Sequence, residues 1–275
     1  MRSAKIDLHC HTKYSFDSIA DPNEVCDNAI KKGIQYIAIT DHCDYDCILS
    51  GLYEDYLADE AKKEICGLKE KYSGTLEVLY GIELGGAHIV PKEAQALVTA
   101  HEFDFVLGSL HNLRDVPDFS FINFEHMPDG LIRSLMHRNI SELCEIAKLP
   151  FINAIAHITY PNRYMKAAGR EVNLSEFEDE FIKLFQIIID TGKALEVNTS
   201  PYRKGIKDTM PEAELLRLYK SCGGTKITVG SDAHLPEGIG DGTSEALEIL
   251  ENTGFNTITV YRAGKGFDIP ISQLK

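Results

Sequence analysis

Short apolar runs alternate with longer amphipathic stretches along the whole chain. The apolar runs are rich in β-branched residues and are mostly continuous, which is typical of strands covered on both faces. They predict strands at Lys5–His9, Tyr36–Asp41, Glu77–Glu83, Phe105–His111, Phe151–His157, Ala194–Thr199 and Lys226–Asp232, with an eighth candidate at Thr257–Tyr261.

The stretches between these runs carry helix signals. Asp21-Pro22 offers an N-cap followed by proline at the first helical position, and Gly33 is placed to end that helix. Further helices are predicted at Tyr53–Tyr72, Pro91–His101, Asp129–Ala147, Leu174–Thr191, Pro211–Ser221 and Ser244–Thr253. Strand–helix alternation without a break in composition predicts an α/β fold. We expect a single closed or nearly closed parallel barrel, in one domain over residues 1–275.

The charge balance narrows the choice of partners. The 275 residues include 28 Lys plus Arg against 42 Asp plus Glu, a formal net charge of −14. This charge would repel the phosphate backbone of a long polynucleotide, so long nucleic acid is not an expected partner. The same acidity attracts divalent cations, and bound cations would in turn accept a small anionic substrate.

The cysteines and the apolar segments bear on the compartment. Seven cysteines form an odd, scattered set without CxxC spacing, which does not indicate a disulfide framework. The N-terminus enters a strand directly, and no run of about eighteen apolar residues occurs. We therefore expect a soluble cytoplasmic protein that does not contact a membrane.

Metal-ligand side chains recur where the predicted strands end. His9 and His11 are separated by one residue, so in a strand their imidazoles face the same way. The ends of parallel barrel strands open on one face, where such side chains converge. The set comprises His9, His11, Asp17, His42, Glu83, His111, His157, Asp232 and His234.

These motifs resemble those of a known superfamily. HxH at the first strand, TDH at the second, GIE at the third, then SLH, AH and a late GSDAH are similar to the motifs of the PHP superfamily, named for polymerase and histidinol phosphatase. The resemblance extends from His9 to the final strand. Leu195–Ser200, followed by Arg203–Gly205, and the ending Ala246–Tyr261 resemble the histidinol-phosphate phosphatase branch.

The resemblance implies a distorted (β/α)7 barrel that holds two to three divalent metal ions. Mixed histidine and carboxylate ligation suits Zn, Fe or Mn. Carried over by motif, the three ligand groups are His9, His11, Glu83 and Asp232; Glu83, His111 and His157; and Asp17, His42 and His234.

The implied activity is phosphomonoester hydrolysis, with L-histidinol phosphate as the small phosphorylated substrate and L-histidinol and orthophosphate as products. Slow uncatalysed hydrolysis requires a strong nucleophile and neutralisation of phosphoryl charge, which a metal-bridging hydroxide and the ions would supply. Glu83 would hold the two ions roughly 3.5–4 Å apart.

Protein groups are also expected around the phosphate and the leaving oxygen. An arginine fork is a common partner of phosphate oxygens, and Arg163 and Arg203 are predicted in loops that follow strands. Exposed arginines also cap surface carboxylates, which is the competing interpretation. Asp232 or His234 would guide the water or deliver the proton to the leaving alkoxide.

Other candidates receive simpler interpretations. Asp41 and Asp7 are expected to orient neighbouring groups rather than bind metal. The acidic segment Cys43–Cys47 is interpreted as an ordinary loop. Ordinary core or surface roles are expected for His88, His101, His126 and His137.

Two other functions remain open at this point. One is a PHP phosphoesterase that acts on nucleotides or short nucleic-acid ends. The other is a catalytically silent PHP module with a scaffolding or regulatory role.

Overall fold

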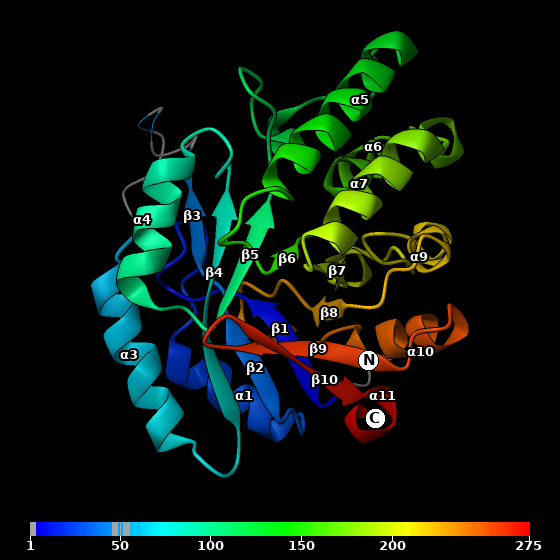
Figure 1. The fold of residues 1–275 in the computed structure, drawn as a ribbon. Coiled ribbons are helices and arrows are strands. Elements are labelled where there is room, and N and C mark those ends of the chain that lie inside the picture. The colour runs from blue at the N-terminus through cyan, green and yellow to red at the C-terminus, as the bar shows by residue number, and fades with distance from the viewer. Residues whose placement is uncertain (1–3, 46–48, 50, 52–55) are drawn as a thin grey trace.

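Seven parallel strands form the centre of the molecule in a computed structural model, which describes residues 4–45, 49, 51 and 56–275. The strands follow one another in the order β1-β2-β4-β5-β6-β7-β8 (Figure 1). Their bounds are β1 Ile6–Cys10, β2 Tyr36–Ile39, β4 Glu77–Gly85, β5 Phe105–Ser109, β6 Ala154–Ile155, β7 Ala194–Asn198 and β8 Ile227–Gly230. Each predicted strand is therefore present; five end one or two residues earlier than expected, and β1 and β4 extend one or two residues further.

The sheet curves until its first and last strands meet. Cys10 forms a parallel bridge with Ala233, and the Asp232 N–H donates to the His9 carbonyl at 2.7 Å. Gly230 permits this approach, because a Cβ atom at this position would overlap the Cβ of His9. The result is a nearly closed, distorted TIM-like barrel, as predicted.

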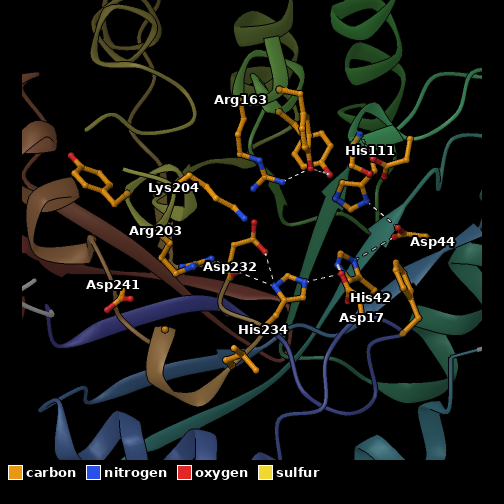
Figure 2. A pocket seen from close by; sticks show the side chains of 18 of the residues that line it. Asp17, His42, Asp44, His111, Arg163, Arg203, Lys204, Asp232, His234 and Asp241 are labelled. Carbon is orange, nitrogen blue, oxygen red and sulfur yellow. Dashed lines mark hydrogen bonds and ion pairs between the residues drawn. The ribbon is translucent and has the colours of Figure 1, made fainter. Parts of the chain in front are cut away.

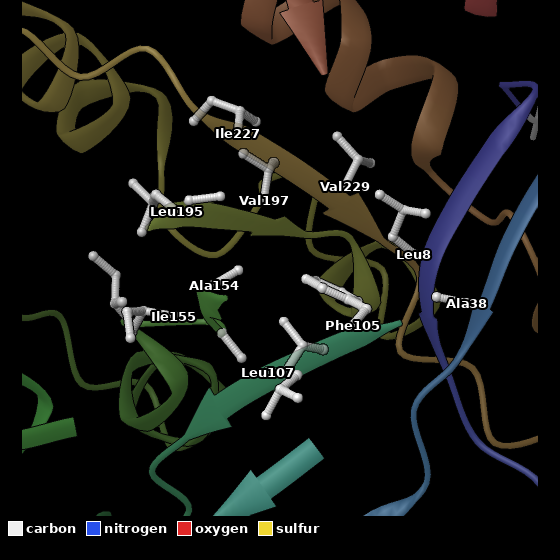
Figure 3. Close-up of a cluster of buried hydrophobic side chains, with 14 of the residues drawn as sticks. Leu8, Ala38, Phe105, Leu107, Ala154, Ile155, Leu195, Val197, Ile227 and Val229 are labelled. Carbon is white, nitrogen blue, oxygen red and sulfur yellow. The ribbon is translucent and has the colours of Figure 1, made fainter. Parts of the chain in front are cut away.

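Side chains on both faces of the barrel strands are buried. Leu8, Phe105, Leu107, Val197 and Val229 are all fully or almost fully buried (Figure 3). Continuous burial along β1, β5, β7 and β8 explains why their sequences do not alternate between apolar and polar residues. A packed interior leaves only the ends of the barrel for a binding site.

Helices surround the sheet and connect its strands. Among the described residues, the α-helices are α1 Pro22–Lys31, α3 Ala58–Lys71, α4 Pro91–His101, α5 Asp129–Ile146, α6 Tyr160–Ala167, α7 Glu178–Asp190, α8 Ser200–Arg203, α9 Ala213–Ser221, α10 Thr243–Asn252 and α11 Ile271–Leu274. Single 3-10 turns are η1 Phe119–Phe121, η2 Leu174–Phe177 and η3 Pro236–Gly238. None of the helices in the described part of the chain has the length and apolar content needed to cross a bilayer.

Local sequence signals account for most helix boundaries. The Asp21 side chain accepts the Asn23 N–H at the start of α1, and Gly33 has a φ of 78°, which ends the helix in the left-handed region. The helix predicted at Tyr53–Tyr72 begins at Ala58, and residues 53–55 lie outside the described part. The helix predicted at Leu174–Thr191 is divided into η2 and α7.

Two strands lie outside the predicted pattern. β3, His42–Asp44, pairs with β4, so the first part of the segment interpreted as a loop is a strand. The remainder of that segment includes residues 46–47, which lie outside the described part. The eighth candidate strand is β9, Thr257–Arg262, but it pairs with β10, Lys265–Pro270, in a separate antiparallel hairpin.

The β9–β10 hairpin covers the end of the barrel where the strands begin. The Tyr261 hydroxyl donates to the Asn153 carbonyl at 3.1 Å, and the Gly264 N–H donates to the Asp104 carbonyl at 3.0 Å. Both acceptors immediately precede barrel strands. Arg262 also pairs with Glu77, the first residue of β4. This end is therefore closed, and the opposite end remains available for a site.

Candidate metal centre and active site

Glu83 lies at the centre of a buried cluster of histidines at the carboxyl ends of the strands. Its Oε2 lies 3.0 Å from His9 Nε2 and 3.1 Å from His42 Nδ1. Its Oε1 lies 2.8 Å from His157 Nε2 and 3.2 Å from His111 Nε2. The two oxygens of one carboxylate thus face two different groups of imidazoles.

The first group gathers around the end of β1. His9 and His11 project to the same side, as the spacing predicts, and their Nε2 atoms are 3.1 Å apart. Asp232, just beyond β8, places Oδ1 3.2 Å from His11 Nε2 and 3.8 Å from His9 Nε2. Closure of the barrel between β1 and β8 therefore brings these four donors, including Glu83, to one point.

The second group lies beyond β5 and β6. His111, His157 and Glu83 offer nitrogen and oxygen atoms that all lie within 4.8 Å of one another. The Nδ1 of His111 is held on its far side by Asp44 Oδ2 at 3.0 Å. This contact directs the Nε2 of His111 toward Glu83.

The third group lies nearer the surface (Figure 2). Asp17 Oδ2 lies 3.0 Å from His234 Nε2 and 3.8 Å from His42 Nε2. The His11 ring stacks between the other two imidazoles, with centroid distances of 4.2 Å to His42 and 4.1 Å to His234. The structure therefore brings all nine predicted site residues into one continuous centre.

The carboxylates and imidazoles of the centre shift one another's pKa values. Burial raises the pKa of Glu83, but the imidazoles of His9, His42 and His111 outweigh it and hold that pKa well below its usual value. Burial likewise lowers the pKa of His42, and the carboxylates of Glu83 and Asp44 raise it to about 9. Burial and the neighbouring His234 and His42 hold the pKa of His11 well below its usual value.

Three cationic side chains lie above this centre. Figure 2 shows Arg163, Arg203 and Lys204 around the same pocket as Asp232 and His234. Arg163 belongs to α6 and Arg203 ends α8, so both predicted loop positions are wrong. Both helices are short, so neither segment has the long apolar stripe from which a helix is predicted in a sequence.

The two arginines differ in their contacts. Arg163 lies between the rings of Tyr160 and Tyr164, with Cζ 4.8 Å from each centroid, and donates to Ser200 Oγ at 3.0 Å. Its Nε is buried and has no hydrogen-bond partner among the described residues. Arg203 instead donates from both terminal nitrogens to backbone carbonyls.

A family model described as "PHP domain" matches residues 7–200. The chain belongs to the PHP domain family. Residues 7–200 include the segments of the first two groups, apart from Asp232, whereas Asp232 and His234 come from the later part of the chain.

Two named relatives match nearly the whole chain. A "Probable histidinol-phosphatase" of Clostridium acetobutylicum is 28% identical over 254 residues, which are 92% of this chain and 95% of that protein. A "Histidinol-phosphatase" of Lactococcus lactis is 24% identical over 263 residues, which are 95% of this chain and 96% of the relative.

A solved structure shares the PHP fold. The histidinol phosphate phosphatase of Lactococcus lactis, crystallised with zinc, L-histidinol and phosphate, superposes with a TM-score of 0.79 at 20% identity. The match covers 95% of this chain and 98% of that chain. The barrel fold is therefore shared along the whole length.

The donor set of this PHP protein fits divalent metal ions. The facing Nε2 atoms of His9 and His11 are both basic, so a cation between them would satisfy both. Imidazole and carboxylate donors are those that transition metals bind, with neutral histidine ligands. Among the described residues, five groups of three side chains could hold a metal ion. Within each group, the three donor atoms lie within 4.8 Å of one another.

Two buried carboxylates were not among the predicted site residues. Glu196 in β7 is 1% exposed, and its Oε1 lies 2.5 Å from His9 Nδ1. Asp44 in β3 is 4% exposed and contacts His111 and His42. A glutamate within the otherwise mostly apolar strand β7 was a signal, because charged groups are rarely buried without a partner.

The two aspartates interpreted as orienting residues hold backbone segments. Asp41 accepts the Thr12 N–H at 2.5 Å and the Ser15 hydroxyl at 2.9 Å, and Ser15 in turn lies 3.0 Å from His11 Nδ1. Asp7 accepts the Ser231 N–H at 2.8 Å, just before Asp232. Burial raises the pKa of both carboxyl groups.

The remaining histidines lie away from the centre. His88 is buried against Glu142 at 3.0 Å. His137 is exposed on α5 and pairs with Glu180 at 2.8 Å. His101 lies beside Asp59, and His126 lies beside Glu125 in an exposed segment.

Proposed function

We propose that this PHP protein is a metal-dependent phosphomonoesterase that hydrolyses L-histidinol phosphate to L-histidinol and orthophosphate. The observation that carries the chemistry is Glu83, whose two oxygens face two separate imidazole groups beneath a pocket that Arg163 and Arg203 help to line. The substrate assignment is supported by the named relatives, which match this chain over nearly their whole length.

The proposed centre holds two to three ions of Zn, Fe or Mn. The first ligand group is His9, His11, Glu83 and Asp232; the second is Glu83, His111 and His157; the third is Asp17, His42 and His234. When bound, such ions activate a water molecule near pH 7 and neutralise charge on the transferring phosphoryl group. In this proposal Glu83 holds the first two groups together, because it contributes one oxygen to each.

Arg163 is the proposed phosphate ligand of the chain. Stacking between Tyr160 and Tyr164, together with donation to Ser200 Oγ and the Tyr164 hydroxyl, holds the guanidinium plane in place. Arginine forks suit the paired oxygens of a phosphoryl group. Arg203 was predicted to act in the same way and shares the pocket.

His234 and Asp232 are the proposed groups for proton movement. The His234 side chain is 29% exposed and lines the pocket, so it can reach a substrate oxygen. Asp17 and Asp232 flank its two nitrogens, at 3.0 Å from Nε2 and 3.7 Å from Nδ1. His234 or Asp232 would guide the attacking water or deliver a proton to the leaving alkoxide.

The rim of the pocket suits a cationic, partly apolar leaving group. Three of its lining residues, Phe16, Phe121 and Leu235, are large apolar side chains with 42%, 66% and 55% exposure. The carboxylates of Asp118 and Glu237 line the same pocket. They would attract the amine and imidazole of histidinol, and they would repel a second phosphate such as that of a nucleoside bisphosphate.

The proposal extends to the catalytic unit, the compartment and the exclusion of long nucleic acid as a substrate. We infer that residues 1–275 act as one catalytic unit in a reducing compartment such as the cytoplasm, which is supported by the six described cysteines, all of them free. The net charge of −14 argues against long nucleic acid as a substrate.

A substrate panel tests the proposal. Phosphate release is measured from L-histidinol phosphate, mononucleotides, nucleoside bisphosphates and 4-nitrophenyl phosphate, with Mn or Zn added and again after chelation. We expect a strong, metal-dependent preference for L-histidinol phosphate. Comparable turnover of many esters would overturn the substrate, a preference for nucleotides would favour the nucleotide phosphoesterase, and a metal-loaded but inert protein would indicate a silent module.

A further inference from the structure

Asp232 has an unusual backbone conformation. Its φ is 55°, in the left-handed region that residues with a side chain rarely adopt. It lies two residues beyond Gly230, the end of β8, and it is almost fully buried. Such a conformation persists only where the surrounding structure determines it.

Arg203 contacts the peptide groups on both sides of Asp232. One terminal nitrogen donates to the Ser231 carbonyl and the other to the Asp232 carbonyl, each at 2.5 Å. These carbonyls belong to the two peptide planes whose rotations define φ and ψ of Asp232. The planar guanidinium fork therefore holds both rotations at once.

The orientation of the carboxylate depends on these rotations. Oδ1 of Asp232 points to His11 Nε2 at 3.2 Å, and Oδ2 accepts from Asn198 Nδ2 at 3.3 Å. The Asp232 N–H is held by the His9 carbonyl. Arg203 supplies the hydrogen bonds to the other side of this turn, and Figure 2 shows it beside Asp232.

We propose that Arg203 is a positioning residue, which holds the left-handed turn at Asp232 so that its carboxylate faces the metal centre. This assigns Arg203 a role different from the phosphate contact considered above. Both terminal nitrogens of Arg203 donate to backbone carbonyls of the Asp232 turn, so its guanidinium fork faces the turn. The inference rests on the proposed metal centre and is independent of the identity of the ester.

Metal retention provides the test. Wild type, Arg203→Met and Arg203→Lys are loaded with Zn²⁺, transferred to buffer containing a chelator, and followed by elemental analysis over time. Loss of a group that orients a metal ligand costs about 10- to 100-fold in metal affinity or activity. We therefore expect both variants to release zinc about tenfold faster or more. Lysine should not rescue, because one ammonium group lacks the planar fork.

A neighbouring cation serves as the control. Lys204 lines the same pocket but is exposed, so Lys204→Met should retain zinc as wild type does. A second measurement separates positioning from general stability. The melting temperature of the metal-free variants should stay close to wild type, while the increase caused by added Zn²⁺ becomes smaller.

Zinc retention in the two Arg203 variants decides whether Arg203 positions Asp232. If Arg203→Met does not fold, Arg203→Lys carries the test, since it keeps the charge and the aliphatic stem. Zinc retention equal to wild type in Arg203→Lys would overturn the proposal. Because retention is measured without substrate, this result is independent of whether the protein hydrolyses L-histidinol phosphate.

Discussion

The carboxylate of Glu196 holds the imidazole of His9, with Oε1 2.5 Å from Nδ1. Its other oxygen, Oε2, accepts the His157 N–H at 2.9 Å. Because a carboxylate accepts, the proton of His9 is placed on Nδ1, and Nε2 is left to face Glu83. One buried side chain from β7 thus fixes residues at the ends of two other strands.

Replacing Glu196 by Gln should weaken the first metal site. A glutamine can present an N–H to His9 Nδ1, which would displace the proton or rotate the ring. We expect metal affinity to fall about 10- to 100-fold, as for other groups that orient histidine ligands. Metal titration of the purified protein measures this. Glu180→Gln is the control, because it removes a glutamate from an exposed histidine pair on α7. Unchanged affinity in Glu196→Gln would contradict the role.

Replacing Glu83 by Ala should remove two ions together. Its oxygens face two groups of imidazoles, so one substitution removes a ligand from each. Elemental analysis should show the loss of two ions per chain relative to wild type. Glu77→Ala is a control on the same strand, where the side chain pairs with Arg262 at the opposite end. Full metal content in Glu83→Ala would refute the bridging role.

Replacing Arg163 by Met should weaken phosphate binding and spare the metal. If the guanidinium binds phosphate in both the ground and transition states, the substitution mainly raises KM. We expect at least a tenfold rise, matched by weaker inhibition by inorganic phosphate, since charge-assisted hydrogen bonds contribute about 1.5–3 kcal/mol. Lys166→Met is the control on the same helix, where Lys166 pairs with Asp208 and Glu212 outside the pocket. A fall in metal content would show that Arg163 acts on the centre instead.

The pair of Glu142 and His88 should make folding sensitive to acid. Burial raises the pKa of Glu142, but the His88 hydrogen bond and the Arg114 N–H outweigh it and lower that pKa below its usual value. A carboxyl group with a lowered folded-state pKa stabilises the protein above its unfolded-state value, near 4.3, and this stabilisation is lost as the pH falls through the folded-state pKa.

The corresponding test compares wild type with Glu142→Gln in chelator. At pH 7 the variant should be less stable by about 1–2 kcal/mol in urea unfolding, because the charged acceptor is lost. The difference should shrink below about pH 4. His137, whose Glu180 partner is exposed, offers a comparison: Glu180→Gln should change stability by less than about 0.5 kcal/mol at either pH. A constant difference across pH would contradict the assignment.

Repeating patterns in the chain were sufficient to predict the barrel and the residues that converge on it. Apolar runs such as β2 favour strands buried on both faces, and the signals at Asp21 and Gly33 marked α1 correctly. The HxH spacing placed His9 and His11 on one side of β1, because side chains alternate along a strand. These rules relate residues that are close together in the sequence, so they can be applied without knowing the folded structure.

Contacts between distant segments required the folded chain. Glu196 is 187 residues from His9, and no spacing rule links them; closure of the barrel places them 2.5 Å apart. Arg203 was expected to bind phosphate from a loop, yet it donates to the carbonyls of a turn that exists only because β8 meets β1. Hydrogen-bond partners depend on angstrom-scale positions in three dimensions, whereas periodicity specifies only which way a side chain faces.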